Sequence, residues 1–424
     1  MFDFFFQVKE LIVSKTAKDS ATIFIGNVLS SVLGIVFTIL AARFLGPENW
    51  GLVAAVGSLI IILVAVGDFG LGAGIFRFAS GLWNTGKISQ AERIYRTVFS
   101  MRLVTAIVIA VLLILLAPWI SQTFLRSSDS TLVFLAAVGV FGTLLLDFQI
   151  VSMQARQSWK IAAIFLALTN LLRVLLTLFL VSIDAVNLYS ILTVFSGSLL
   201  IIWAISYFWR PSLPQLGEGW RKTIREVAPF SGWMAGNKIV SSINSRVDVL
   251  LLVTLTGAYD AGIYAAANRL VLGVPLILGS FATVLAPRFA SIDGRQELLD
   301  FFKKAIGLSV LIAILLAIGV LIAPLVISLF GESYRDSGSV LQWLLIGFIP
   351  FVLSTPSVNV LIYHFQKPQV ITLLSLFQLP LILVLNFYGI PRFGVFGPVI
   401  TLGIVNLLTF FVTAFFAWQY LRRL

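Results

Sequence analysis

The feature that most constrains this chain is the recurrence of long apolar stretches along its whole length. An apolar helix of about 20 residues crosses the roughly 30 Å hydrocarbon core of a bilayer. Because lipid offers the backbone no hydrogen-bond partners, each stretch is predicted to be helical. We predict an all-α, polytopic membrane protein with twelve transmembrane helices. Their ranges are 21–42, 51–76, 98–120, 131–153, 160–183, 187–208, 228–253, 261–287, 305–330, 338–361, 369–389 and 395–420.

Composition excludes the soluble alternatives. Apolar residues make up 59% of the chain and charged residues 11%, against about 45–50% and about 25% in soluble globular proteins. Because so little polar surface cannot coat a body of this size in water, a soluble enzyme, a disordered chain and a nucleic-acid-binding domain are excluded. The chain has no cysteine and one histidine, His364. No thiolate or histidine metal site can be built from these, so neither a metal nor a resident cofactor is expected.

The positive charges indicate an orientation. Lysine and arginine collect on the cytoplasmic side of membrane proteins. With the N-terminus inside, the cytoplasmic connections and helix ends carry 21 of them against 4 outside, and Arg102, near the start of 98–120, is counted among the 21. We therefore predict a multi-pass protein of the cytoplasmic (inner) cell membrane with both termini in the cytoplasm. The net charge of +11 indicates membrane lipids as partners rather than nucleic acid.

Short connections place the function within the helices. The longest connections have about 20 residues and are all predicted to be cytoplasmic. A membrane enzyme that assembles lipid-linked glycans would need a substantial outer loop carrying acid and base groups, and the outer connections here have about ten residues or fewer. We expect no enzyme. The segment 1–20 mixes apolar residues with lysines and is predicted to lie at the cytoplasmic interface.

An internal repeat divides the chain. FRFAS at 76–80 recurs as PRFAS at 287–291, an offset of 211 residues, and the Gly-x4-Gly of Gly46 and Gly51 recurs at the same offset in Gly257 and Gly262. Repeated halves are typical of transporters in which two bundles rock about a shared cavity. We predict two pseudo-symmetric six-helix lobes. Their ranges are 21–208 for the N-terminal lobe, 209–227 for a cytoplasmic linker and 228–424 for the C-terminal lobe.

Four cations fall inside predicted membrane spans: Arg173, Lys238, Arg246 and Arg269. Each costs about 2.5–3.5 kcal/mol at the centre of a membrane helix, so such groups persist where they face a wet cavity or a partner. Spread through the membrane, they suit an anionic head group whose phosphates meet a charge-assisted hydrogen bond at each depth. The alternative is a set of structural ion pairs, with Asp248 as the nearest candidate partner of Arg246.

Three acids and two asparagines complete the polar set within the spans. Asp68, Asp147 and Asp248 could each carry a proton or bind Na⁺. The alternative is a structural role, in which the carboxylate pairs with an arginine or caps a helix broken between glycines, and we favour this role for Asp68. Asn27 and Asn237 occupy matching places on the polar faces of the first and seventh predicted helices. These faces either line a wet cavity or let helices pack closely. We predict substrate contacts for both asparagines, and the three acids are the candidates for any coupling to H⁺ or Na⁺.

Two stretches resemble a known family. GNVLSSVLGIVFTILAARFLGPENWGLVAAV followed by VAVGDFGLGAGIFRFAS, and later RVDVLLLVTLTGAYDAGIYAAANRLV, are similar to the oligosaccharide flippases, also called polysaccharide biosynthesis proteins. These belong to the multidrug/oligosaccharidyl-lipid/polysaccharide exporter superfamily. The resemblance implies a secondary transporter that moves a polyprenyl-pyrophosphate-linked oligosaccharide from the inner to the outer leaflet for surface polysaccharide synthesis.

The resemblance also implies a site and partners. The four span cations would supply the cationic central cavity of the family, and polysaccharide polymerases and glycosyltransferases would be partners. The relative that flips the peptidoglycan precursor typically has fourteen helices and an arginine-rich first helix. Since the first helix here has no arginine within the membrane, that substrate is disfavoured. The alternative function is a cation-coupled multidrug exporter of the same superfamily, in which acids would outnumber bases in the cavity.

Overall fold

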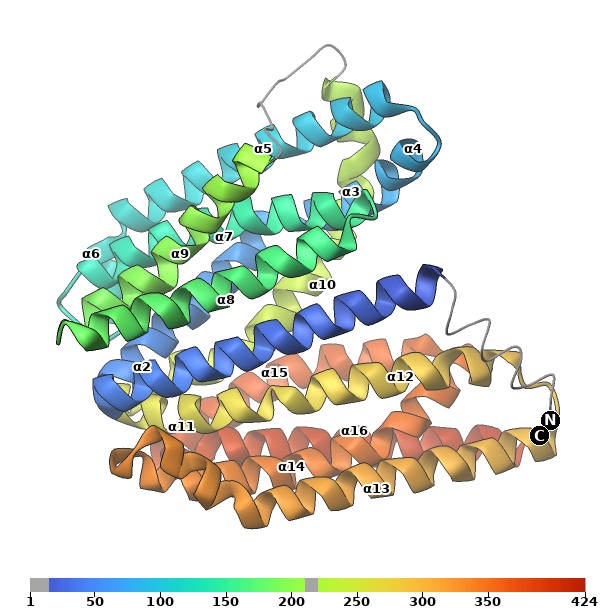
Figure 1. Ribbon diagram of the computed structural model, residues 1–424. Helices are drawn as coiled ribbons and strands as arrows, with labels where there is room; N and C mark the ends of the chain where they lie inside the picture. Colours follow the sequence, from blue (N-terminus) through green and yellow to red (C-terminus); the bar gives the residue numbers. More distant parts are fainter. Residues whose placement is uncertain (1–14, 210–219, 424) are drawn as a thin grey trace. The chain divides into compact units, whose positions relative to one another are not determined.

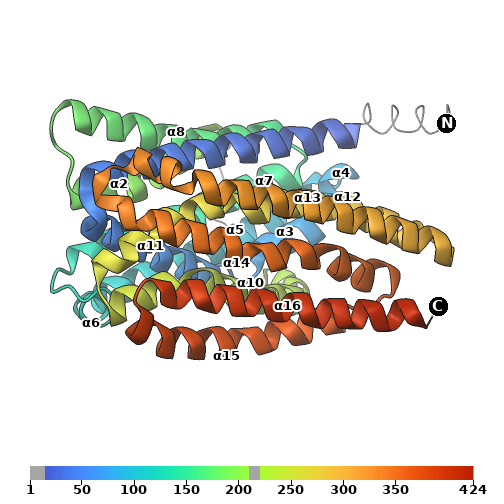
Figure 2. The same cartoon turned by 90° about the horizontal axis from the view of Figure 1, so that it is seen from below.

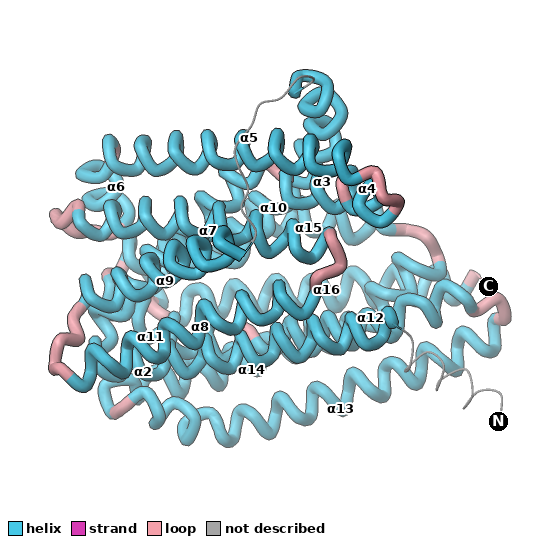
Figure 3. Tube along the Cα trace, turned by 45° about the horizontal axis from the view of Figure 1, so that its top comes forward, coloured by secondary structure: helices cyan, strands magenta, loops and turns pink. Residues whose placement is uncertain are grey.

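The protein is helical throughout the part that its computed structural model describes, residues 15–209 and 220–423 (Figure 1). Within these residues no strand is present (Figure 3), which confirms the predicted all-α class. Short 3₁₀ turns at Ser328–Phe330 and Glu332–Tyr334 and a π turn at Val360–His364 adjoin the longer helices. The α-helices are α2 (Lys15–Asp68), α3 (Leu71–Phe78), α4 (Ser80–Asn84), α5 (Ile88–Leu115), α6 (Ala117–Phe124), α7 (Thr131–Ala155), α8 (Trp159–Ser182), α9 (Leu188–Trp209), α10 (Trp220–Leu255), α11 (Ala258–Val271), α12 (Gly273–Ser291), α13 (Arg295–Ile327), α14 (Arg335–Asn359), α15 (Pro368–Phe393) and α16 (Phe396–Arg422).

The helices have the dimensions and surface of a multi-pass membrane protein. In the described residues, ten helical stretches are long and apolar enough to cross a bilayer, and the twelve predicted ranges are helical apart from short breaks such as the one at Phe69 and Gly70. The kinked α2 covers two of these ranges, and the more highly charged α10 covers the seventh. Large apolar side chains face outward, among them Leu321 and Leu325, which are 78% and 72% exposed. An exposed apolar surface of this kind is stable in lipid and not in water.

Contacts divide the chain into two compact units. The first holds the described residues up to Leu45 together with Ala55–Arg246, and the second holds Gly46–Ala54 together with Val247–Leu424. In the first unit α7 is the central helix and packs against α5, α8 and α9 (Figure 1). In the second, α14 lies between α13 and α16, and α15 packs against α16 (Figure 2). The predicted interfacial segment, 1–20, and linker, 209–227, lie largely outside the described residues, and the predicted lobe boundaries stay a prediction.

The internal repeat recurs in the backbone. Gly46 kinks α2 with φ 74° and ψ 168°, and Gly257 precedes α11 with φ 116° and ψ 174°. Only glycine adopts this region readily. In the second unit the two glycine segments also cross, because a Cβ on Gly51 would meet the carbonyl of Ala258 and a Cβ on Gly262 would meet that of Pro47. The contact is reciprocal between repeat-related positions, as expected of a duplicated fold.

Candidate functional site

A break in the second predicted span creates the site. Helix α2 ends at Asp68, Phe69 and Gly70 take positive φ values of 46° and 66°, and α3 begins at Leu71. A Cβ on Gly70 would lie 2.8 Å from the backbone nitrogen of Ala235, so only glycine lets this turn approach α10. The break leaves the Asp68 carboxylate at the negative end of a helix dipole, where a nearby cation is needed to stabilise it.

Two cations from different helices meet Asp68. Arg102 of α5 pairs with Oδ1 of Asp68, and its Nε donates to the carbonyl oxygen of Leu144 at 3.0 Å. Lys238 of α10 donates from Nζ to Oδ2 at 2.9 Å. The side chains of Arg102 and Asp68 are 2% and 5% exposed, whereas that of Lys238 is 43% exposed. Arg102 is therefore a buried anchor for the carboxylate, while the lysine amine is accessible from one side.

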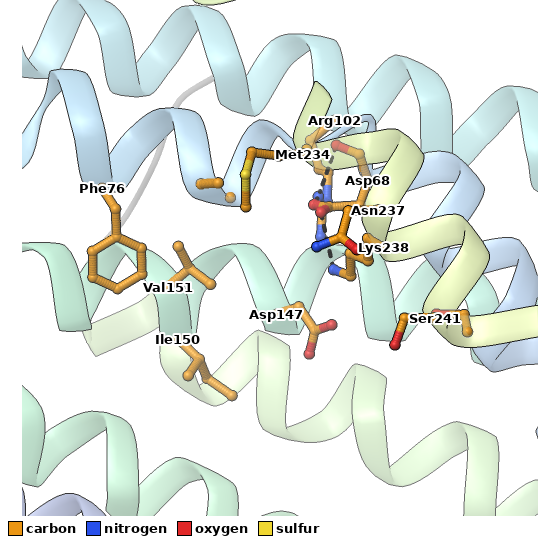
Figure 4. A pocket seen from close by; sticks show the side chains of 14 residues that line it. Asp68, Phe76, Arg102, Asp147, Ile150, Val151, Met234, Asn237, Lys238 and Ser241 are labelled. Carbon is orange, nitrogen blue, oxygen red and sulfur yellow. Dashed lines mark hydrogen bonds and ion pairs between the residues drawn. The ribbon is translucent and has the colours of Figure 1, made fainter. Parts of the chain in front are cut away.

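The accessible side is a cavity of about 500 Å³ within the first unit (Figure 4). Asp147 of α7 lies on its wall, close enough to Arg102 and Lys238 for their charges to interact. Among the described residues Asp147 makes no hydrogen bond or ion pair. Apolar groups such as Ile150 and Val151 complete the wall. The polar and charged side chains of the lining are Asp68, Arg102, Asp147, Asn237, Lys238, Ser241 and Ser242.

The cavity brings together four of the residues predicted from the sequence. Asp68 and Asp147, predicted to couple ions, lie beside Lys238 and Asn237, predicted to contact substrate. These residues come from α2, α7 and α10, which are far apart in the sequence. The cavity contains two acids and two bases, and Lys238 is the base whose side chain is open to it.

The other predicted residues lie elsewhere. Arg173 of α8 donates to Ser198 Oγ at 2.9 Å and to the Phe195 carbonyl at 2.8 Å, and its guanidinium carbon lies 4.2 Å from the centroid of the Phe195 ring. Asn27 is exposed on α2, outside the lining of this cavity. These partners, Ser198 and Phe195, are neutral groups of its own unit, and they bind the charge of Arg173 by hydrogen bonds and a cation–π contact.

Three predicted residues near the boundary of the units are also outside the lining. Arg246 ends the first unit and is half-buried, and Arg269 is half-buried near the end of α11. Asp248 accepts hydrogen bonds from the Tyr264 hydroxyl and from the backbone N–H of Val249. A tyrosine hydroxyl and a backbone amide thus hold this carboxylate, which fixes its orientation on α10.

Arg102 is the site residue that the sequence reasoning placed wrongly. The predicted orientation assigns it to the cytoplasmic charges, yet in the structure it is 1% exposed. Its position four residues past the start of the predicted range 98–120, between Met101 and Leu103, was the available signal. A cation inside a predicted span belongs with the groups that need a partner, and Asp68 is that partner.

Comparisons with known proteins agree on one family. The family model described as "Polysaccharide biosynthesis protein" matches residues 16–293. A putative O-antigen transporter of Shigella flexneri is 27% identical over 42% of this chain and 44% of its own length. The capsular polysaccharide biosynthesis protein CapF of Staphylococcus aureus is 22% identical over 90% of this chain and 94% of its own length.

Solved structures share the fold. The lipid II flippase MurJ in an inward closed conformation matches 93% of this chain and 86% of its own, with a TM-score of 0.73 and 13% identity. An inward-facing multidrug resistance MATE family transporter of the MOP superfamily matches 93% of this chain and 95% of its own, with a TM-score of 0.68 and 16% identity.

Proposed function

The chain belongs to the polysaccharide biosynthesis protein family, and we propose that it is a secondary transporter that flips a polyprenyl-pyrophosphate-linked oligosaccharide from the inner to the outer leaflet. Its relatives are named as an O-antigen transporter and a capsular polysaccharide biosynthesis protein. These names support the synthesis of a surface glycan as the pathway that the transporter serves. The proposal includes the cytoplasmic membrane as location, both termini inside, and polymerases and glycosyltransferases as partners.

One observation carries the proposal: Lys238 shares Asp68 with a second cation. A buried carboxylate that loses its only partner is strongly destabilised. Here Asp68 has two partners, Arg102 on Oδ1 and Lys238 on Oδ2, so the carboxylate would keep one partner if the lysine amine turned away. Lys238 is therefore free to exchange Asp68 for a phosphate oxygen, which accepts an equally strong charge-assisted hydrogen bond.

Neighbouring groups on α10 extend the anion site. Asn237, Ser241 and Ser242 line the same cavity as Lys238 and lie within one helical turn of it. Their amide and hydroxyl hydrogens can donate to phosphate or to sugar hydroxyl groups. We assign the head group of the lipid-linked sugar to this wall. Substrate contacts by Arg173, Arg246, Arg269 and Asn27 stay predictions.

We assign the coupling ion to Asp147. Its carboxylate lines the cavity and makes no hydrogen bond or ion pair with the described part of the chain. A phosphate bound at Lys238 would repel this carboxylate, and binding of H⁺ or Na⁺ to Asp147 removes that repulsion. Ion binding and head-group binding would then favour each other. Coupling through Asp68 and Asp248 is less favoured because both already accept hydrogen bonds from side chains.

The test is flipping by reconstituted full-length protein. Proteoliposomes carrying a fluorescent polyprenyl-pyrophosphate-linked oligosaccharide report flipping as the fraction that an external glycosidase can reach. Lys238→Gln should lower the rate at least tenfold, and the exposed Lys304→Gln should not change it. Flipping by Lys238→Gln at the wild-type rate would overturn the proposal.

The open carboxylate of Asp147 also fits the second candidate, an exporter of organic cations. That function predicts the opposite dependence on the two charges, because a cationic drug binds Asp147 and is repelled by Lys238. Uptake of a fluorescent organic cation into the same vesicles should then be lost in Asp147→Asn and retained in Lys238→Gln. The flippase predicts no such uptake.

A further inference from the structure

A second cavity, of different character, lies beside the charged one. It has a volume of about 170 Å³, and none of its lining residues is charged. Phe69 and Leu71 line it from the break after α2, Val98 and Met101 from α5, and Val227 from α10. An apolar cavity of about 150 Å³ accepts a benzene-sized molecule, so this one has room for a small hydrocarbon group.

The two cavities share three elements, α5, α10 and the break after α2, and the charged cavity is lined by α7 as well. At the break, Asp68 and Gly70 line the charged cavity, while Phe69 and Leu71 line the apolar one. On α5, Met101 lines the apolar cavity and the next residue, Arg102, lines the charged one. On α10, Gly232 lines the apolar cavity and Met234, within the same turn, lines the charged one. A ligand that fills both would therefore have an anionic group next to a hydrocarbon chain.

A buried hydroxyl lies where α10 passes from one cavity to the other. Ser231 lines the apolar cavity, is 2% exposed, and its Oγ makes no hydrogen bond with the residues that the structure describes. A buried hydroxyl without a partner is uncommon and calls for an explanation. It lies one turn from Met234 and two turns from Lys238 on the same helix.

We infer that the apolar cavity binds the first isoprene unit of the polyprenyl chain while the pyrophosphate binds at Lys238, with the Ser231 hydroxyl donating to the ester oxygen between them. This inference rests on the proposed function and adds the place of the lipid tail. The occupant is the allylic end of a prenyl pyrophosphate, since the acyl chains of a glycerophospholipid are separated from phosphate by a polar glycerol ester. Such an ester would lie against a wall without a charged group.

The chain offers a matched pair of variants. Gly232 and Gly236 are both exposed on α10, and a Cβ on either would meet no atom within 4 Å. Gly232 lines the apolar cavity, and Gly236 lines neither cavity. Gly232→Leu should therefore fill the cavity without disturbing the fold, and Gly236→Leu adds the same side chain one turn away.

The experiment is photolabelling of the full-length protein in nanodiscs by geranyl pyrophosphate with a diazirine on its first isoprene unit. Label should map by mass spectrometry to the peptides that contain Phe69 and residues 223–232. It should fall at least tenfold in Gly232→Leu and stay unchanged in Gly236→Leu. Equal labelling of the two variants, or label confined to other helices, would overturn the inference.

Two further measurements distinguish a prenyl ligand from bilayer lipid, and failure of the tail site from failure of the proposed function. If a phosphatidylglycerol with a photoreactive acyl chain labels the cavity and excess geranyl pyrophosphate does not displace it, the cavity belongs to bilayer lipid and the inference is wrong. If Lys238→Gln flips normally while the prenyl label still maps to the cavity, the proposed function fails and the tail site stands. If Lys238→Gln abolishes flipping and the label maps elsewhere, the proposed function stands and the tail site fails.

Discussion

Replacing Arg102 by methionine tests whether the charges around Asp68 divide into a fixed pair and a releasable one. The side chains of Arg102 and Asp68 are 2% and 5% exposed, and breaking a buried pair by removing one partner costs about 3–5 kcal/mol. The side chain of Lys238 is 43% exposed, and exposed pairs contribute at most about 1 kcal/mol. We therefore expect Arg102→Met to lower the free energy of unfolding by about 3–5 kcal/mol and Lys238→Met by about 1 kcal/mol.

The measurement is equilibrium unfolding of the purified protein in mixed micelles of a mild and a denaturing detergent at neutral pH. The exposed Lys304→Met is the control for loss of a lysine. Adding Asp68→Asn to Arg102→Met should restore part of the loss, because the remaining buried group is then neutral. If Lys238→Met costs as much as Arg102→Met, the lysine amine is a fixed part of the fold, and the exchange of Asp68 for a substrate phosphate is refuted.

Three further predictions use the same preparations. A Cβ on Gly262 would meet backbone of α2, so Gly262→Ala should lower the free energy of unfolding by about 1–3 kcal/mol, whereas Gly273→Ala, with no atom within 4 Å of the new Cβ, should not. Asp147→Asn should remove the dependence of the flipping rate on pH or Na⁺, measured in the proteoliposome assay. The Tyr189 hydroxyl donates to Asp129 at 2.6 Å and lowers the pKa of Asp129 below its ordinary value. The stability from this bond is present above about pH 4 and is lost as the pH falls through the lowered pKa. In an acid pH series, the free energy of unfolding of Asp129→Asn should therefore lack this loss.

The fold could be predicted from hydropathy because a single chain segment in lipid can satisfy its backbone hydrogen bonds only as a helix. A chain segment that crosses a bilayer must satisfy its own hydrogen bonds, so each apolar range becomes helix. Hydropathy did not reveal the break at Phe69 and Gly70, which lies inside one apolar range, 51–76. The glycines on either side of Asp68, Gly67 and Gly70, were the local signal for a broken helix, and the close approach of Gly70 to α10 is a tertiary contact that the sequence does not give.

The site was predictable by residue type but not by pairing. Lys238, Asp68 and Asp147 were identified because a charge in a membrane span needs a reason to be there. Their meeting in one cavity depends on how α2, α7 and α10 pack. Arg173 shows the complementary difficulty, since the structure holds it with a serine hydroxyl, a backbone carbonyl and an aromatic ring. Sequence patterns can suggest a carboxylate partner for a buried arginine, but they do not indicate a neutral partner such as a hydroxyl or a carbonyl.

The duplication shows that the charged cluster accompanies a local departure from the repeated backbone. Both copies keep the positive-φ glycine, Gly46 and Gly257, whereas the break after Asp68 has no counterpart 211 residues later, where α12 runs from Gly273 to Ser291. The central helix of the second unit, α14, has no carboxylate beyond Asp336 near its start. The cluster takes Asp68 and Arg102 from the first copy and Lys238 from the second, and buried charges cost stability that an apolar replacement would not. On the proposed function, this cost is offset by the anionic cargo that the cluster binds. The positions 211 residues from Asp68, Arg102 and Lys238 hold Gly279, Ala313 and Asn27.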